Sequence, residues 1–304
     1  IAVSAEAERR RIDLIVEGAQ LVTMDPERPL IPDGAVAIDG GAIVAVASRA
    51  AIHRDYEGRQ VIAGKDRVLM PGLVNGHTHA AMVLFRGLAD DLDLMTWLTK
   101  VIFPMEGRFV DADFVATGAR LACWEFIRGG TTTVVDMYFH PEVSAQEFES
   151  CGLRAILGAP MIDYPSPGFE GWDDSYAAGR RFAAEWTDRN GRIRPALAPH
   201  APYSVAPEHL RQVAVAAREL GVPVMIHLAE DQAELDAVRK RYRTTPIRHL
   251  QALGLLDVPL IAAHVVLPAR KEIPLLATAG TGVIHNPTSN LKTGAGIAPV
   301  PDLL

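Results

Sequence analysis

The chain has 304 residues, of which 49% are hydrophobic and 22% are charged, and its formal net charge is −7. This composition predicts a globular protein and excludes collagen, coiled coils and general disorder. The negative charge argues against a nucleic-acid partner, because phosphate binding needs clustered Lys and Arg, which occur here only in short runs such as Arg239-Lys240-Arg241. No apolar stretch approaches the roughly 20 residues that span a bilayer, and residues 1–13 lack a signal-peptide pattern. We therefore expect a cytoplasmic protein with no membrane partner.

Residues 11–69 contain short β-branched runs that are separated by turn signals, such as Asp39-Gly40-Gly41. This pattern predicts a small antiparallel sheet. After Met70 the pattern changes to buried apolar runs of strand length, including TTTVVDM, PVMIHLAE and LIAAHVV, with helical stretches between them. We therefore place a domain boundary here, with residues 1–69 before it and residues 70–304 after it.

The alternation of strands and helices after Met70 predicts an α/β fold with a parallel sheet, and the number of units predicts a (β/α)8 barrel of the TIM type. If LMPGLVNGHTH is counted as the first strand, the chain supplies seven barrel strands. We therefore expect this chain to be part of a longer one that supplies the eighth strand.

The two cysteines, Cys123 and Cys151, lie in apolar contexts and show no C-x-x-C spacing. Their positions suggest neither a disulfide framework nor a cysteine zinc site. We expect both to be core residues.

Five histidines point to a metal site. His77 and His79 form an H-x-H pair at the end of an apolar strand, where side chains two residues apart face the same side. His200, His227 and His264 each follow a different predicted strand, at the face where barrel enzymes collect their catalytic groups. Imidazole ligands suit zinc, with iron, manganese or nickel as alternatives.

Glu230 follows His227 by three residues, just beyond the strand end. There it is placed to act as a carboxylate that accepts and returns protons, although a glutamate that caps the next helix is the alternative. A divalent metal lowers the pKa of coordinated water toward about 7. The pattern therefore predicts hydrolytic attack at an sp2 carbon.

Several longer segments resemble one enzyme family. They are PGLVNGHTHAAMVLFRGLADDLDLMTWL, RGGTTTVVDMYFHPE, HAPYS, HLAE, AAHVV and HNPTSNLKTGAGIAPV. Their order and approximate spacing resemble those of the 5'-methylthioadenosine/S-adenosylhomocysteine deaminases, a branch of the amidohydrolase superfamily that is also similar to triazine hydrolases and guanine deaminases. The resemblance covers nearly the whole chain. It also implies that residues 1–69 form part of a small β-sandwich completed by the C-terminal part of a longer chain.

The resemblance implies specific roles for the residues that match the family's motifs. The metal ligands are His77, His79 and His227, the residue that orients water and the oxyanion is His264, the proton shuttle is Glu230, and the ribose contacts are Glu106 and His200. Two alternatives stay open. Glu106 also fits a carboxylate at a helix start, and Trp97 either walls the pocket or packs in the core.

The sequence departs from the family pattern at two points. The family has a last metal-ligand aspartate after the eighth strand, which lies beyond this sequence; Asp136 belongs to another strand and is expected to be structural. Ala159 stands where some relatives have an arginine near the amino-acid tail of the nucleoside. This difference favours a smaller 5'-substituted adenosine at least as much as S-adenosylhomocysteine.

The resemblance thus implies a metal-dependent deaminase that converts an adenine nucleoside, namely 5'-methylthioadenosine, S-adenosylhomocysteine or adenosine, to its inosine analogue and ammonia. The implied cofactor is one divalent ion, zinc first, and the implied assembly is a homo-oligomer. A related reaction on guanine or a triazine is the nearest alternative. A catalytically inactive homologue or fragment is the alternative from another class.

Overall fold

The computed structural model describes residues 8–187, 189 and 191–304. The chain divides between Gly72 and Leu73 into two compact units. Among the described residues, no helix combines the length and the apolar composition needed to cross a membrane.

The first unit is a mixed sheet with one helix. Its elements are β1 (Arg10–Val22), β2 (Leu30–Asp39), β3 (Ala42–Ser48), α1 (Arg49–Asp55), β4 (Tyr56–Ile62) and β5 (Val68–Leu69). The strand order is β3-β2-β1-β4, with β5 also paired to β1. Its core contains Ile12, Ile15, Ala35, Ala37 and Ile52.

The expectation of a wholly antiparallel sheet is wrong for this unit. The pairs β1–β2 and β2–β3 are antiparallel, but β4 and β5 both pair with β1 in parallel. Helix α1 explains the difference, because a strand can return parallel to its neighbour only after a crossover connection, and α1 supplies one between β3 and β4.

The second unit contains parallel strands that pair in chain order. They are β6 (Leu73–Thr78), β7 (Thr131–Met137), β8 (Arg154–Gly158), β9 (Pro160–Met161), β10 (Ile193–Pro195), β11 (Ala198–Pro199), β12 (Val224–Leu228), β13 (Leu260–His264) and β14 (Gly282–Ile284). One run is β6-β7-β8-β10, a second is β12-β13-β14, and β9 pairs with β11. A parallel bridge between Leu197 and Val224 joins the residues after β10 to β12. The alternation expected after Met70 is therefore present as an α/β unit.

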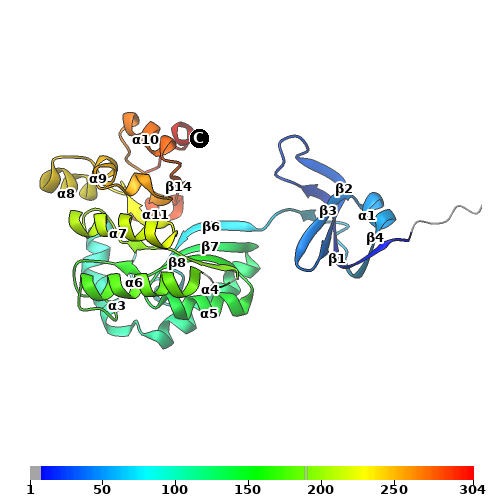
Figure 1. Ribbon diagram of the computed structural model, residues 1–304, viewed down its shortest axis with the longest axis horizontal. Helices are drawn as coiled ribbons and strands as arrows, with labels where there is room; N and C mark the ends of the chain where they lie inside the picture. The colour runs from blue at the N-terminus through cyan, green and yellow to red at the C-terminus, as the bar shows by residue number, and fades with distance from the viewer. Residues whose placement is uncertain (1–7, 188, 190) are drawn as a thin grey trace, which may run out of the picture. The chain divides into compact units, whose positions relative to one another are not determined.

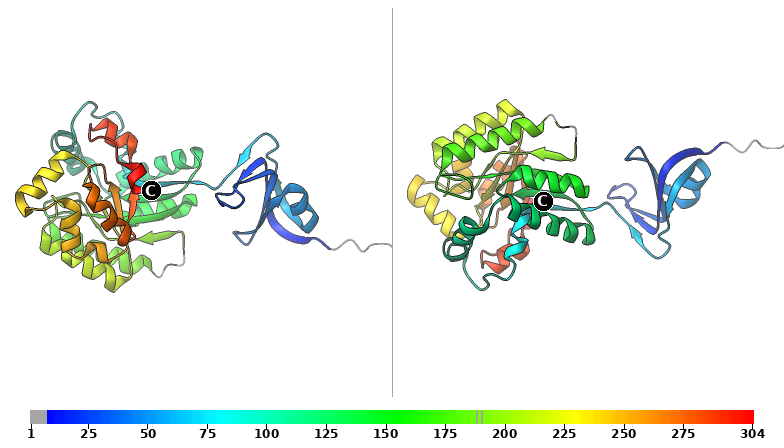
Figure 2. Two further views of the ribbon diagram at one scale, coloured as in Figure 1. Left: turned by 90° about the horizontal axis from the view of Figure 1, so that it is seen from above. Right: turned by 90° about the horizontal axis from the view of Figure 1, so that it is seen from below.

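Helices alternate with these strands along the chain, and the longer ones pack around them (Figures 1 and 2). The helices are α2 (Leu94–Thr96), α3 (Phe103–Phe109), α4 (Ala112–Arg128), α5 (Pro141–Cys151), α6 (Trp172–Thr187), α7 (Pro207–Leu220), α8 (Gln232–Tyr242), α9 (Pro246–Ala252), α10 (Ile273–Thr278), α11 (Pro287–Lys292) and α12 (Val300–Leu303). Short 3-10 helices cover Ala80–Phe85, Leu255–Asp257 and Arg270–Glu272, and a π-helical turn covers Trp97–Ile102.

Close packing of α4 supports the segment that follows β6. A Cβ atom on Gly118 would lie 2.6 Å from the carbonyl oxygen of Ala81. Only glycine allows this approach, because any larger residue would push the helix away from the backbone next to His79. Helix α4 thereby helps to fix the end of the first strand of this unit.

The two cysteines differ from the expectation that they would be separate core residues. Cys123 of α4 and Cys151 of α5 are joined in a disulfide. Cys123 is also buried in the hydrophobic cluster around Phe148, so the expectation of a core position is correct for it. The pairing was missed because two cysteines separated by 28 residues give no local signal that two neighbouring helices bring them together.

Candidate active site

The structure gathers all five predicted histidines around one cavity of about 590 Å³. His77 lies in β6 and His79 directly follows it, while His227 and His264 are near or at the ends of β12 and β13. His200 directly follows β11. These strands are parallel, so their carboxyl ends meet at one edge, which explains why the histidines converge.

Three of these histidines form a group that fits a metal ion. The ligand nitrogen atoms of His77, His79 and His227 all lie within 4.8 Å of one another. The Nδ1 atom of His79 lies 2.5 Å from the carbonyl oxygen of Met137, and that of His227 lies 2.7 Å from the carbonyl oxygen of His200. Each of these carbonyls accepts the Nδ1 proton and leaves Nε2 as a lone-pair donor, as in protein zinc sites.

The protonation state of these rings also suits metal binding. Burial lowers the pKa of His77, His79 and His227. For His77 and His227 the neighbouring histidines lower the pKa further, because a positive charge on one ring disfavours a second. The three imidazoles are therefore neutral at physiological pH, which is the form that coordinates a metal.

Glu230 and His264 face each other beside this group. The Oε1 atom of Glu230 lies 3.5 Å from Nδ1 of His264, and both side chains are buried. Burial, reinforced by the carboxylates of Glu234 and Asp231, raises the pKa of Glu230 to about 8. A glutamate with this pKa holds a proton near neutral pH and can both donate and recover it.

The ring of His264 is held by a residue that follows β14. Its Nδ1 atom lies 3.1 Å from Oδ1 of Asn290, which accepts the ring proton. Burial lowers the pKa of His264 to about 4, and the hydrogen bond to Asn290 acts in the opposite direction. The ring is therefore neutral, and its Nε2 atom is the acceptor that remains for a ligand.

Glu106 lies in the first turn of α3 and is buried. It lines a small cavity of about 60 Å³ together with His79, Trp97 and His200, which also line the main cavity. Burial raises the pKa of Glu106 to about 7, and the nearby Tyr138 hydroxyl acts in the opposite direction. Glu106 is thus both a helix-start carboxylate and a cavity residue. Trp97 lines the pocket and does not pack in the core.

Two further predicted residues are fixed by specific contacts. Nδ1 of His200 lies 2.9 Å from the hydroxyl oxygen of Ser204, which in turn donates to the carbonyl of Ala201. Asp136 is buried, and its Oδ1 atom accepts the backbone N–H of Ala80 at 2.6 Å. Asp136 therefore supports the turn after His79, in line with the structural role expected for it.

Some cavity residues were not singled out from the sequence. His285 and Asn286 follow β14 and line the main cavity, as does Tyr203. The rule that polar residues after parallel strands share one edge would have found His285, which stands in the HNPTSN segment. Asn290 and Glu234 carry no such signal, because their roles depend on contacts with distant or backbone atoms.

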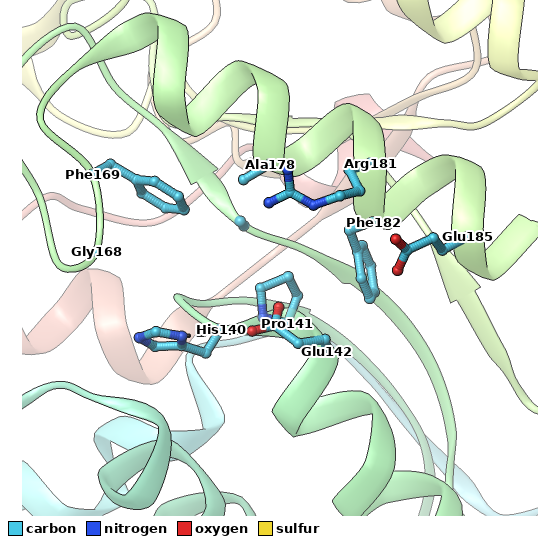
Figure 3. Close-up of a pocket in the computed structure, with 10 residues that line it drawn as sticks. His140, Pro141, Glu142, Gly168, Phe169, Ala178, Arg181, Phe182 and Glu185 are labelled. Carbon is cyan, nitrogen blue, oxygen red and sulfur yellow. Dashed lines mark ion pairs between the residues drawn. The ribbon is translucent and has the colours of Figure 1, made fainter.

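A second cavity, of about 350 Å³, lies between α5 and α6. Figure 3 shows Arg181 and Glu185 of α6 facing His140 and the start of α5 across it. The His140 ring is 3.6 Å from the carboxylate of Glu142. Ala159 lines this cavity, not the one that holds the histidines.

Comparison with known proteins identifies the family. Residues 68–304 match the model of the amidohydrolase family. The chain belongs to the amidohydrolase family. The family and its structural neighbours imply a fold of the (β/α)8 TIM type.

Curated amidohydrolase relatives are similar over most of the chain. It is 41% identical over 294 residues to the 5-methylthioadenosine/S-adenosylhomocysteine deaminase of Syntrophobacter fumaroxidans, covering 97% of this chain and 67% of the relative. It is 46% identical over 252 residues to the protein of the same name from Carboxydothermus hydrogenoformans, covering 82% of this chain and 57% of the relative. The chain thus spans about two thirds or less of these relatives' lengths.

Solved structures agree with the family assignment. An adenosine deaminase from Xanthomonas campestris with bound Zn superposes with a TM-score of 0.94 at 38% identity, covering 97% of this chain and 67% of that one. A triazine hydrolase from Arthobacter aurescens gives a TM-score of 0.85 at 24% identity, covering 95% and 68%. The second likeness concerns the fold alone.

Proposed function

We propose that this chain carries the catalytic centre of a metal-dependent deaminase that hydrolyses the exocyclic C–N bond of an adenine nucleoside. One observation carries the proposal: three neutral histidines converge in a cavity beside a protonatable glutamate, Glu230. The names of the similar proteins, which refer to deaminases of adenosine and its 5'-thio derivatives, support the same reaction.

The first part of the proposal concerns the metal. His77, His79 and His227 would hold one divalent ion, and zinc is favoured because the similar adenosine deaminase contains it. When bound, the ion supplies hydroxide at neutral pH by lowering the pKa of water.

The second part concerns proton transfer. In its ionised form, Glu230 takes one proton from water and delivers it to the ring nitrogen beside the reacting carbon, which makes that carbon more electrophilic. After the water oxygen has bonded to that carbon, Glu230 takes the second proton from the new hydroxyl group and delivers it to the departing amino group, so that a C=O bond forms as the C–N bond breaks and ammonia leaves. His264, held by Asn290, orients the incoming water through Nε2. The overall change is one water consumed and one ammonia released.

A ribosylated substrate is supported by the cavity that adjoins the histidines. Glu106 is buried there with His200 nearby, and a buried carboxyl group needs hydrogen-bond partners. Ribose hydroxyls would supply such partners, whereas guanine and triazines have no sugar. We therefore rank an adenine nucleoside above these two alternatives.

The test is ammonia release by the full-length protein, with its metal content measured beforehand. The panel is 5'-methylthioadenosine, S-adenosylhomocysteine, adenosine, guanine and a chlorotriazine. We expect about one zinc per chain, turnover of at least one nucleoside, and loss of turnover after chelation that added zinc restores. Turnover of guanine or the triazine alone would replace the proposed substrate, and a metal-loaded protein inert to the panel would overturn it.

Four finer features stay predictions. They are a count of seven barrel strands within this chain, a β-sandwich that includes residues 1–69, a cytoplasmic location and a homo-oligomeric assembly. Light scattering of the purified full-length protein tests the last, because a homo-oligomer has a mass that is a multiple of the chain mass.

A further inference from the structure

Glu234 is a buried carboxylate that faces backbone atoms and does not line the main cavity. Only 2% of its surface is exposed. Its Oε1 atom accepts the backbone N–H of Ala229 at 3.0 Å, and its Oε2 atom accepts the backbone N–H of Glu230 at 2.8 Å. The Glu234 side chain therefore binds the N–H groups of two consecutive residues, and the second of these is Glu230, the proposed proton shuttle.

The position of Glu234 in α8 resembles a known capping arrangement but differs from it in one respect. Asp231 caps α8 by accepting the N–H of Glu234. In a capping box, the glutamate at this third helical position reaches back to the N–H of the cap residue itself. Glu234 instead reaches beyond Asp231 to the two residues before it, so its hydrogen bonds order the turn that precedes the helix.

That turn has a conformation that needs support. Ala229 has a φ of 49°, in the left-handed region that a residue with a Cβ atom avoids. The carbonyl of Ala229 accepts the N–H groups of Val266 and Leu267 at 2.9 and 3.0 Å. The turn is thus tied on one side to Glu234 and on the other to the segment that follows His264.

We propose that Glu234 is a positioning residue, which fixes the peptides of Ala229 and Glu230 so that the Glu230 side chain stays beside His264. This inference rests on the proposed role of Glu230. The two side chains are 3.5 Å apart, and a change in the turn would move Glu230 relative to the metal-binding histidines. Since proton transfer needs hydrogen-bond reach, displacement of Glu230 slows the reaction without removing the residue that performs it.

The chemistry of the contact explains why a carboxylate stands here. Two N–H donors need two acceptor oxygens, and a carboxylate offers both. Glutamine has the same shape but only one acceptor, and its NH2 group would face one of the N–H donors. Alanine has no acceptor. The substitutions Glu234→Gln and Glu234→Ala therefore remove one and then both hydrogen bonds.

A matched control is available in the same unit. Glu272 is also buried, with 1% of its surface exposed. It accepts hydrogen bonds from the Thr245 hydroxyl at 2.5 Å and the Ala269 N–H at 3.2 Å, its Oε1 atom lies 3.3 Å from Nε of Arg248, and it does not line the histidine cavity. Glu272→Gln therefore disturbs a similar buried network without touching the turn before α8.

The experiment compares these variants in the full-length protein. We expect kcat to fall about 10-fold in Glu234→Gln and about 100-fold in Glu234→Ala, with KM and zinc content nearly unchanged, because misplacement of a catalytic group costs rates of this order. Glu272→Gln should lower the melting temperature as much as Glu234→Gln does but keep kcat within about twofold of the unsubstituted protein, since its contacts hold no catalytic group.

Hydrogen exchange of the amides of Ala229 and Glu230 gives a readout that does not depend on activity. It should accelerate in both Glu234 variants and stay unchanged in Glu272→Gln. Folded, zinc-loaded Glu234 variants with unchanged kcat would overturn the inference, as would equal kcat losses in Glu272→Gln. If the unsubstituted protein turns over no nucleoside, the proposed function fails, while unchanged exchange in the Glu234 variants would show separately that the carboxylate does not hold the turn.

Discussion

The two units of the chain differ in the burial of their acidic side chains. In the first unit, Arg10 and Asp39 form a surface pair: they are 2.8 Å apart, and their side chains are 59% and 31% exposed. In the second unit, Glu106, Glu230 and Glu234 are at most 6% exposed. Surface pairs keep most of their hydration, whereas burial of a carboxyl group is unfavourable unless other groups compensate.

Burial of these carboxyl groups has opposite consequences for stability and for activity. Burial raises the pKa of Glu106 to about 7 and that of Glu230 and Glu234 to about 8. These three buried carboxyl groups destabilise the folded protein at high pH, where they ionise, and two of them, Glu106 and Glu230, line cavities in which they can hold a proton near neutral pH. Clusters of this kind are typical of functional sites. Substitutions should therefore have large effects on catalysis around the cavity and small effects in the first unit.

The largest effect is expected for Glu230→Gln. Glutamine has nearly the same shape but cannot carry a proton between water and the substrate, so kcat should fall by about 10²–10⁴-fold. Zinc content should not change, because the ligand nitrogens belong to His77, His79 and His227. Steady-state kinetics and metal analysis of the purified full-length protein check both expectations.

The control for Glu230→Gln is Glu185→Gln. Glu185 is an exposed glutamate that lines the cavity of Figure 3. Its substitution should leave kcat within about twofold, because no proposed catalytic group contacts it. A kcat for Glu230→Gln within tenfold of the original value would mean that another group shuttles the proton, and the role of Glu230 would have to be abandoned.

An intermediate effect is expected for Glu106→Gln. The substitution should make the folded protein more stable but weaken substrate binding. The folded-state pKa of Glu106 is about 7, whereas the ordinary pKa of a glutamate side chain is about 4.5, so folding favours the protonated form. The associated stability is fully present below a pH of about 4.5 and is lost as the pH rises through about 7. Glutamine mimics the protonated form, so the variant should be more stable by about 1–3 kcal/mol near pH 8 and equally stable near pH 4.

Urea unfolding of the full-length protein at the two pH values measures this difference. If Glu106 binds ribose, the same variant should show a higher KM for the nucleoside. A variant that is less stable than the original near pH 8 would show that the carboxylate is stabilised in its ionised form by partners, which would contradict the assignment of burial as the main cause of its raised pKa.

Part of the site and part of the fold could be predicted from the sequence. His77, His79, His200, His227 and His264 were predictable, because each follows or ends an apolar strand and parallel strands bring such residues to one edge. The motif resemblance added Glu106, which has no periodic signal of its own. The barrel was predictable for the same reason as the histidines, since strand and helix patterns alternate along the chain.

Other features depend on contacts that no local pattern records. The parallel pairing of β4 with β1 depends on the crossover through α1, and the disulfide depends on how α4 packs on α5. The bond from Asn290 to His264 spans 26 residues. The hydrogen bonds of Glu234 are local in sequence, but they end on backbone N–H groups, which every residue except proline has and which therefore give no signal in the sequence.

The smallest effect is expected in the first unit, for the pair of Arg10 and Asp39. Both side chains are solvated, so a double-mutant cycle of Arg10→Ala and Asp39→Ala should give a coupling energy of about 0.5 kcal/mol or less, and added salt should reduce it further. Hydrogen exchange of the β1 amides in the full-length protein measures the local free energy of opening, which suits a unit whose unfolding need not coincide with that of the barrel. Deaminase activity should not change in any of the three variants. A coupling energy above about 2 kcal/mol would be as large as that expected for a buried ion pair. The strength of a charge interaction in this protein would then depend on the partners of each charge and not on its exposure.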